Sequence, residues 1–299
     1  MTVVNRVSVR RAWDRRLWLG CAAGALLLAG FVRLAAETPP LLFCAALLPA
    51  GACAAAVVAL DGGVHASRRL LAGAFLWGAV VAPVVAVALN VALRGWLGDT
   101  GSAWAAGLGA PLIEEAAKGA ALIALVLVWP DEVDGVADGI VYGLLIGLGF
   151  TMAENLFYFA AAALVGGGAG LVESVYLRGA LGGLTHAIFT AATGAGFGWA
   201  RRRTGPLALA GALLGFAVAV AQHSAWNAVG AEWLDAAPCA PRAAMACPLS
   251  GRLWYWLLTA PAIVLSFLLP GIVAVVWLYR RRRSPGLSPV AARQSRSGW

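Results

Sequence analysis

The feature that most constrains this chain is a series of long apolar stretches separated by short turns or charged residues. About 20 consecutive apolar residues are enough for one α-helix to cross the hydrocarbon core of a bilayer. Of the 299 residues, 61% are hydrophobic and 12% are charged, and a water-soluble domain could not bury that much apolar surface. The sequence therefore predicts an all-α, polytopic transmembrane bundle of about eight helices. The predicted spans are residues 17–33, 41–60, 70–93, 110–129, 139–164, 177–200, 206–229 and 253–279.

Arginines are distributed unevenly between the predicted loops. With an even number of spans both termini share one side, and this side collects sixteen arginines against five on the other. Positive residues favour the cytoplasmic side, so we expect a multi-pass protein of the cell (inner or plasma) membrane with both termini in the cytoplasm. The first apolar stretch is expected to be retained, since Leu34-Ala35-Ala36 is a poor cleavage site for a signal peptidase. The formal charge of +8 comes from arginine runs beside apolar stretches, which is typical of membrane anchoring and not of nucleic-acid binding.

The chain is predicted to be a single transmembrane domain over residues 1–299, with basic cytoplasmic tails at 1–16 and 284–299. The loop between the last two spans is expected outside, where Cys239 and Cys247 can form a disulfide because that compartment is oxidising. Small residues recur at four-residue intervals in the central spans, which lets helix backbones approach closely. These glycines are Gly139, Gly143, Gly147, Gly194, Gly198, Gly211 and Gly215.

Three glutamates, two histidines and the single lysine fall inside the predicted spans, all of them in the four spans between residues 110 and 229, and no aspartate does. A charge at bilayer depth is costly and is a functional hypothesis by default. At a rise of about 1.5 Å per residue, the acids and histidines lie roughly 7–15 Å below the outer ends of their helices, so they share one half of the membrane. The six are Glu114, Glu115, Lys118, Glu154, His186 and His223.

Spacing within single helices indicates how some of these groups pair. Lys118 comes four residues after Glu114 and three after Glu115, so either carboxylate can pair with it and one is left over. His223 and Asn227 are four residues apart and share a helix face.

The residue types suit peptide hydrolysis by activated water, because carboxylates can act as bases and histidine and asparagine can donate hydrogen bonds to an oxyanion. The same residues also suit a zinc site built from two histidines and a glutamate, and a proton relay in a transporter. Both remain alternatives. The H-E-x-x-H and G-x-S-x-G motifs are absent from the chain.

Four ordered motifs on four consecutive predicted spans resemble those of the PrsW family of intramembrane proteases, which is related to CAAX-prenyl endoproteases and bacteriocin-processing membrane proteases. The run Glu114-Glu115-Ala116-Ala117-Lys118 resembles the first motif, E-E-x-x-K. The match covers residues 111–227, which we call the motif-bearing core. The other motifs are D-G-x-x-Y-G at 138–143 leading to G-F-x-x-x-E-N at 149–155, Arg178 with His186, and H-x-x-x-N at 223–227.

This resemblance implies proteolysis of membrane-anchored protein substrates, as in the release of an anti-sigma factor. It implies that Glu114 is the general base and works with His186 or Glu154. It also implies that His223 and Asn227 stabilise the oxyanion. A proton- or cation-coupled transporter is the alternative function.

Cofactor use stays open between none and a divalent metal such as zinc. If a metal is present, the expected ligands are His186, His223 and Glu154. The expected partners are a membrane-anchored substrate and the lipid bilayer, with no nucleic acid. The candidate catalytic residues are Glu114, Glu115, Glu154, His186, His223 and Asn227, supported by Asn155, by Arg178 and by Lys118, which would orient Glu115.

Overall fold

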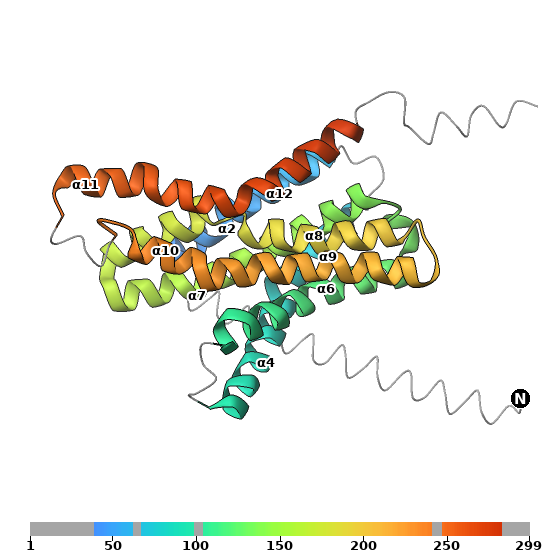
Figure 1. Cartoon of the computed structure of the whole chain (residues 1–299), viewed down its shortest axis with the longest axis horizontal. Coiled ribbons are helices and arrows are strands. Elements are labelled where there is room, and N and C mark those ends of the chain that lie inside the picture. The colour runs from blue at the N-terminus through green and yellow to red at the C-terminus, as the bar shows by residue number, and fades with distance from the viewer. Residues whose placement is uncertain (1–38, 62–66, 99–103, 241–246, 283–299) are drawn as a thin grey trace, which may run out of the picture.

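The computed structural model describes residues 39–61, 67–98, 104–240 and 247–282, and every regular element within them is a helix. The predicted all-α class is confirmed, while the first predicted span, 17–33, lies outside the described residues. Figure 1 shows most of the longer helices running side by side as a bundle. The helices are α2 (Pro40–Asp61), α3 (Arg68–Leu76), α4 (Ala82–Leu97), α6 (Ala110–Val128), α7 (Val136–Ser174), α8 (Thr185–Ala200), α9 (Gly205–Ala225), α10 (Ala231–Ala236), α11 (Leu249–Trp254) and α12 (Ala260–Arg282).

Five helical segments of the described part are long and apolar enough to cross a membrane. One of them folds back at Gly167, where φ is +58°, a value that glycine adopts readily. The predicted spans 139–164 and 177–200 lie on its two legs. α6 is not among the five, because it carries two glutamates and a lysine. The segments confirm a multi-pass chain rather than a particular number of crossings. They are Pro40–Asp61, Arg68–Leu97, Val136–Ala200, Gly205–Ala228 and Leu249–Leu269.

Glycines bring α7 and α8 into direct backbone contact, as their spacing predicts. A Cβ atom on Gly143 would lie 2.6 Å from the carbonyl oxygen of Thr190, and one on Gly147 would lie 2.4 Å from that of His186. Larger residues at these positions would push the helices apart. The backbone of His186 is thereby held against α7. Further close approaches of this kind join Gly139 to Gly194, Gly196 to Gly211 and Gly149 to Phe75.

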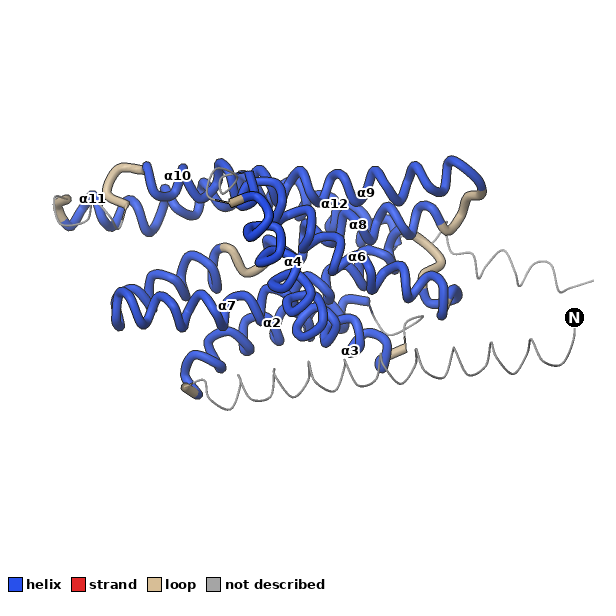
Figure 2. The backbone as a smooth tube through the Cα atoms, turned by 90° about the horizontal axis from the view of Figure 1, so that it is seen from below, coloured by secondary structure: helices blue, strands red, loops and turns tan. Residues whose placement is uncertain are grey.

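Three loops meet at one end of the bundle, which we call the loop end (Ser67, 130–134 and 201–203). Glu132 Oε2 accepts hydrogen bonds from Ser67 N and from Tyr142 Oη, each at 2.9 Å. Arg201 Nη2 donates to the carbonyl oxygen of Pro130 at 2.9 Å. Figure 2 shows the loops mainly at the two ends of the bundle. The arginine distribution predicts all three loops on the cytoplasmic side, and their contact agrees with that prediction.

The opposite end carries the predicted disulfide. Cys239 and Cys247, with Cα atoms 5.6 Å apart, are joined between α10 and α11. The C-terminal part of α7, which contains Gly167, lies at the same end, near α10 and α11 (Figure 1). Both features belong to the side that the arginine distribution predicts as external.

Candidate active site

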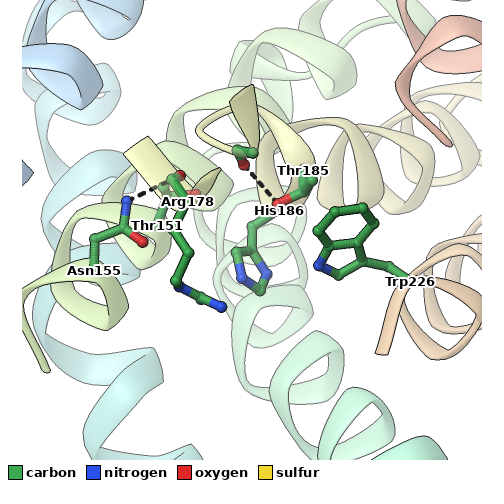
Figure 3. A pocket seen from close by; sticks show the side chains of 7 residues that line it. Thr151, Asn155, Arg178, Thr185, His186 and Trp226 are labelled. Atoms are coloured by element: carbon green, nitrogen blue, oxygen red, sulfur yellow. Dashed lines mark hydrogen bonds between the residues drawn. The ribbon is translucent and has the colours of Figure 1, made fainter. Parts of the chain in front are cut away.

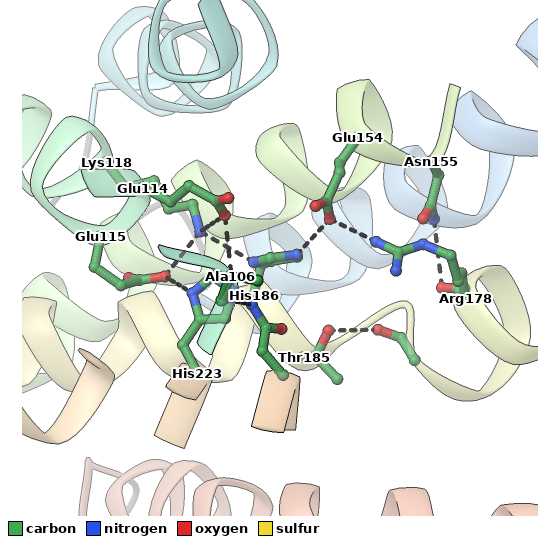
Figure 4. A network of polar contacts seen from close by, with 12 residues as sticks. Ala106, Glu114, Glu115, Lys118, Glu154, Asn155, Arg178, Thr185, His186 and His223 are labelled. Carbon is green, nitrogen blue, oxygen red and sulfur yellow. Dashed lines mark hydrogen bonds and ion pairs between the residues drawn. The ribbon is translucent and has the colours of Figure 1, made fainter. Parts of the chain in front are cut away.

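α6, α7, α8 and α9 bring the predicted ionisable residues together in one buried network (Figure 4). Its hydrogen bonds run from Glu115 and Lys118 on α6 to His186 on α8, and from His186 to Glu154 on α7. The close contact of Gly147 with the His186 carbonyl fixes the distance between the last two helices. The clustering expected from depth in the membrane is therefore present in the fold.

Lys118 distinguishes the two adjacent glutamates, because it is hydrogen-bonded to one and only at ion-pair distance from the other. Its Nζ donates to Glu115 Oε1 at 2.8 Å but lies 3.9 Å from Glu114 Oε2. Glu115 also accepts from Thr190 Oγ1 at 3.0 Å, and His223 Nδ1 lies 3.1 Å from it. Glu114 Oε2 is buried and has no hydrogen-bond partner among the described residues. The carboxylate that the spacing leaves over is Glu114.

His186 has a defined tautomer. Its Nδ1 lies 3.0 Å from Lys118 Nζ, and its Nε2 lies 2.7 Å from Glu154 Oε2. An ammonium group can only donate, so Nδ1 accepts, and Nε2 carries the proton that it donates to the carboxylate. His186 is therefore neutral in this arrangement, and the lone pair on Nδ1 that accepts from Lys118 points toward α6.

His223 is oriented by a carboxylate and by aromatic packing. While Nδ1 faces Glu115, Nε2 lies 3.7 Å from Glu114 Oε2. The imidazole stacks on the Phe189 ring with centroids 5.3 Å apart and meets the His186 ring nearly at right angles, with centroids 4.9 Å apart. The second ring nitrogen is thus directed at the unpaired glutamate.

Glu154 lies between a histidine and an arginine. Its Oε2 accepts from Arg178 Nη2 at 2.6 Å as well as from His186. The guanidinium of Arg178 lies 3.6 Å above the Tyr158 ring, and Asn155 Nδ2 donates to the main-chain oxygen of Arg178 at 3.3 Å. Asn155 and Arg178 are therefore part of the same network, next to Glu154.

Asn227 is the one candidate that the described structure places outside this network. Its Nδ2 donates to the Ala106 carbonyl oxygen at 3.5 Å. A π-helical turn, Trp226–Gly230, begins between His223 and Asn227. A π turn holds more residues than an α turn, so a spacing of four no longer puts the two side chains one above the other.

The donor set fits a divalent metal. Glu114, His186 and His223 each offer a ligand atom, and these atoms lie within 4.8 Å of one another. Each histidine also gives its other ring nitrogen to a carboxylate, His186 to Glu154 and His223 to Glu115. Such outer carboxylates commonly orient histidine ligands around zinc. The ligands expected from the sequence are His186, His223 and Glu154. In the structure Glu114, and not Glu154, lies with the two histidines.

A small pocket adjoins His186 (Figure 3). Thr151, which lines this pocket, was not among the candidates taken from the sequence. It lies four positions before Asn155 in an apolar helix, so the two polar side chains share a helix face, and this spacing was the signal that could have identified it. Trp226 forms one wall. The pocket is lined by Thr151, Asn155, Arg178, Gly182, Thr185, His186 and Trp226.

Comparison with known proteins identifies the family. A family model described as PrsW family intramembrane metalloprotease matches residues 66–279, more than two thirds of the chain. This match extends beyond the motif-bearing core to α3, α4 and most of α12. No curated protein and no solved structure matched the chain. The ordered motifs, the buried glutamate–histidine network and the family match together show that the chain belongs to the PrsW family and is an intramembrane protease.

Proposed function

We propose that this enzyme hydrolyses peptide bonds of membrane-anchored proteins, of the anti-sigma-factor kind, at the cluster of Glu114, His186 and His223. The supporting observation is the unequal pairing of two adjacent glutamates. Glu115 is bonded to three groups, whereas Glu114 Oε2 has no hydrogen-bond partner among the described residues. A carboxylate with a free oxygen beside two histidines is suited to accept a proton from water.

In the proposed reaction Glu114 Oε2 takes a proton from water as the water oxygen bonds to the scissile carbonyl carbon. His223, in its protonated form, donates a hydrogen bond to the oxyanion that develops, and Asn227 can join it only after releasing the Ala106 carbonyl oxygen. Glu114 then passes its proton to the departing amine as the C–N bond breaks. Glu154 holds the proton on Nε2 of His186, which keeps Nδ1 directed at the cluster.

A divalent cation such as zinc would be held by Glu114, His186 and His223, and when bound it would polarise the scissile carbonyl and lower the pKa of water. For His186 to serve as a ligand through Nδ1, Lys118 has to release that nitrogen, which lies 3.0 Å from Nζ. Lys118 can do so and keep its bond to Glu115.

The test is Glu114→Gln, which keeps the shape of the side chain but removes the basic oxygen. We expect normal insertion and a loss of about 10²–10⁴-fold in cleavage of a single-span test substrate. Proteins that accumulate uncut in a deletion strain supply natural candidates for that substrate. Near wild-type cleavage by well-inserted Glu114→Gln would show the proposal to be wrong.

Glu115→Gln is the matched control, because it makes the same change one residue along. It should lower activity chiefly through the amount of folded protein, since Lys118 loses its buried partner. Metal analysis of the purified variants separates two roles of Glu114. Loss of one equivalent of metal in Glu114→Gln assigns the residue to metal binding, and full metal content with lost activity assigns it to proton transfer.

The proposed setting is the cell membrane, with both termini cytoplasmic and one membrane domain over the whole chain. The contacts within the loop end support it, because loop 130–134 joins the two segments that carry arginines, 67–69 and 201–203. If an impermeant thiol reagent labels a cysteine placed in the C-terminal tail of intact cells, this orientation is wrong. The alternative function, a proton- or cation-coupled transporter, depends on an ion gradient. Cleavage of the test substrate in vesicles that have no ion gradient would therefore exclude it.

A further inference from the structure

The pocket beside His186 lies on the side of the ring that faces away from Glu114 (Figures 3 and 4). Polar side chains of Thr151, Asn155 and Arg178 line it together with His186. Its volume is sufficient for about one water molecule. The pocket is therefore too small for a substrate side chain but the right size for the other reactant of a hydrolase.

Two buried polar atoms at this pocket lack a hydrogen-bond partner among the described residues. They are Oγ1 of Thr151, a residue with 3% exposure, and Nε of Arg178. An unsatisfied buried polar group costs about 1–3 kcal/mol. Such groups in folded proteins are normally satisfied by ordered water when no protein partner is present.

The backbone at the pocket is interrupted in a way that also favours water. The π-helical segment Val175–Leu181 ends, and α8 begins only at Thr185. Gly182, in the break, lines the pocket. Inside a bilayer, non-helical backbone is tolerated where it is buried in protein or lines a water-filled cavity.

The polar side chains in and beside the pocket range from partly exposed to buried. The side chain of Arg178 is 29% exposed and that of Glu154 21%, whereas that of His186 is 6% exposed. Arg178 precedes the break and His186 follows it, so Arg178 lies on the side of the break that is nearer the predicted outer end of this leg. The exposed fraction thus falls along one set of polar side chains, from Arg178 through Glu154 to His186.

We infer that this pocket is the port through which the hydrolytic water enters the site from the outer face, with Thr151 and Arg178 as its hydrogen-bonding groups. This inference rests on the proposed function, because hydrolysis consumes one water for each peptide bond broken. The port and the base lie on opposite sides of His186, so substrate can approach the Glu114 side while water is supplied from the other.

The experiment measures whether water-borne reagent reaches Thr151. Cysteine is introduced as Thr151→Cys in a full-length protein in which Cys21, Cys44 and Cys53 are alanine, and the Cys239–Cys247 disulfide is kept. The probe is externally added Ag⁺, which binds thiols, is about the size of a water molecule and does not cross bilayers; its reaction is read as protection of the thiol from alkylation after unfolding. The matched control is Thr193→Cys, since Thr193 is equally buried, also has an unpartnered Oγ1, and does not line the pocket.

We expect the thiol at 151 to react at least about tenfold faster than the thiol at 193, and only when the reagent is outside. Equal, slow reaction at both positions in inserted protein overturns the inference. If Thr151→Cys fails to insert, Thr185→Cys on another wall replaces it and must meet the same criterion. Labelling requires no cleavage, so the two proposals fail separately. Rapid labelling at 151 with no cleavage by the wild-type protein would disprove the proposed function and leave the port intact, whereas cleavage by the wild type with slow labelling at 151 would overturn the port alone.

Discussion

The loop end and the buried network around Glu114 are both polar, but they use their polar groups differently. At the loop end, most of the bonds join side chains to backbone: Glu132 accepts from Ser67 N, and Arg201 donates to a carbonyl oxygen. The bond from Tyr142 to Glu132 joins two side chains. In the network, side chains bond to side chains, and Glu114 Oε2 has no hydrogen-bond partner among the described residues.

The first pattern closes loops, while the second leaves bonding capacity available for a ligand. We therefore expect changes at the loop end to alter stability and changes in the network to alter turnover. The comparison is tested most severely by Glu114→Gln, described above, and then by the following variants.

Glu154→Gln should give the next largest effect. It weakens the bond that orients His186 and the ion pair with Arg178, and loss of such outer partners typically costs about 10–100-fold in metal affinity or activity. The turnover of purified protein measures this. Glu132→Gln is the matched change at the loop end and should leave turnover per folded molecule unaltered. Equal losses in both variants would remove the distinction between the two regions.

Gly147→Ala tests the contact that supports the network. The new Cβ would lie 2.4 Å from the carbonyl oxygen of His186, so α8 must shift, at a cost of about 1–3 kcal/mol. Unfolding in detergent measures the stability, and turnover should fall with it. Gly166→Ala is the control, because nothing lies within 4 Å of a Cβ there. An undisturbed Gly147→Ala protein would contradict the packing described here.

Tyr142→Phe should lower stability less than Gly147→Ala does, and it should leave turnover unchanged. It removes the hydroxyl that bonds to Glu132 Oε2, and one such hydrogen bond contributes about 0.5–1.5 kcal/mol. Unfolding in detergent and the turnover of the remaining folded protein check the two halves of this statement. A reduced turnover at unchanged stability would place Tyr142 with the network and not with the loop end.

Arg202→Gln should have the smallest effect of all. The Arg202–Asp134 pair spans 3.9 Å, and its side chains are 61% and 72% exposed, so solvent screening leaves it roughly 0–1 kcal/mol. Stability and turnover should both stay close to wild type. A large loss of inserted protein would instead show that the positive charge acts during membrane insertion.

Much of the fold was predictable because its signals are local. Apolar stretches of helix-spanning length indicated the membrane class, and the four-residue spacing of glycines such as Gly143 and Gly147 indicated where helices approach. The E-E-x-x-K spacing predicted that Lys118 would pair with one of two glutamates. It could not say which, because the answer depends on Thr190 and His223, which reach Glu115 from α8 and α9.

The candidate site was predictable as a set of residues but not as an arrangement. Asn227 departs from the face of His223 because a π-helical turn changes the register, and neither residue type nor spacing signals that turn. Thr151 escaped notice because a single threonine in an apolar helix is ordinary until a helix break at Gly182 places a pocket beside it.

The sequence by itself determined that this chain is a helical membrane protein with its ionisable residues on four consecutive central spans. These properties depend on composition and on spacing within single helices. Only the tertiary structure decided that Glu115 is the paired glutamate, that Glu154 supports His186, and that Glu114 lies with the two histidines. Those relations join residues up to 109 positions apart, Glu114 and His223. They depend on how far each helix is rotated and how closely its glycines let it approach the next.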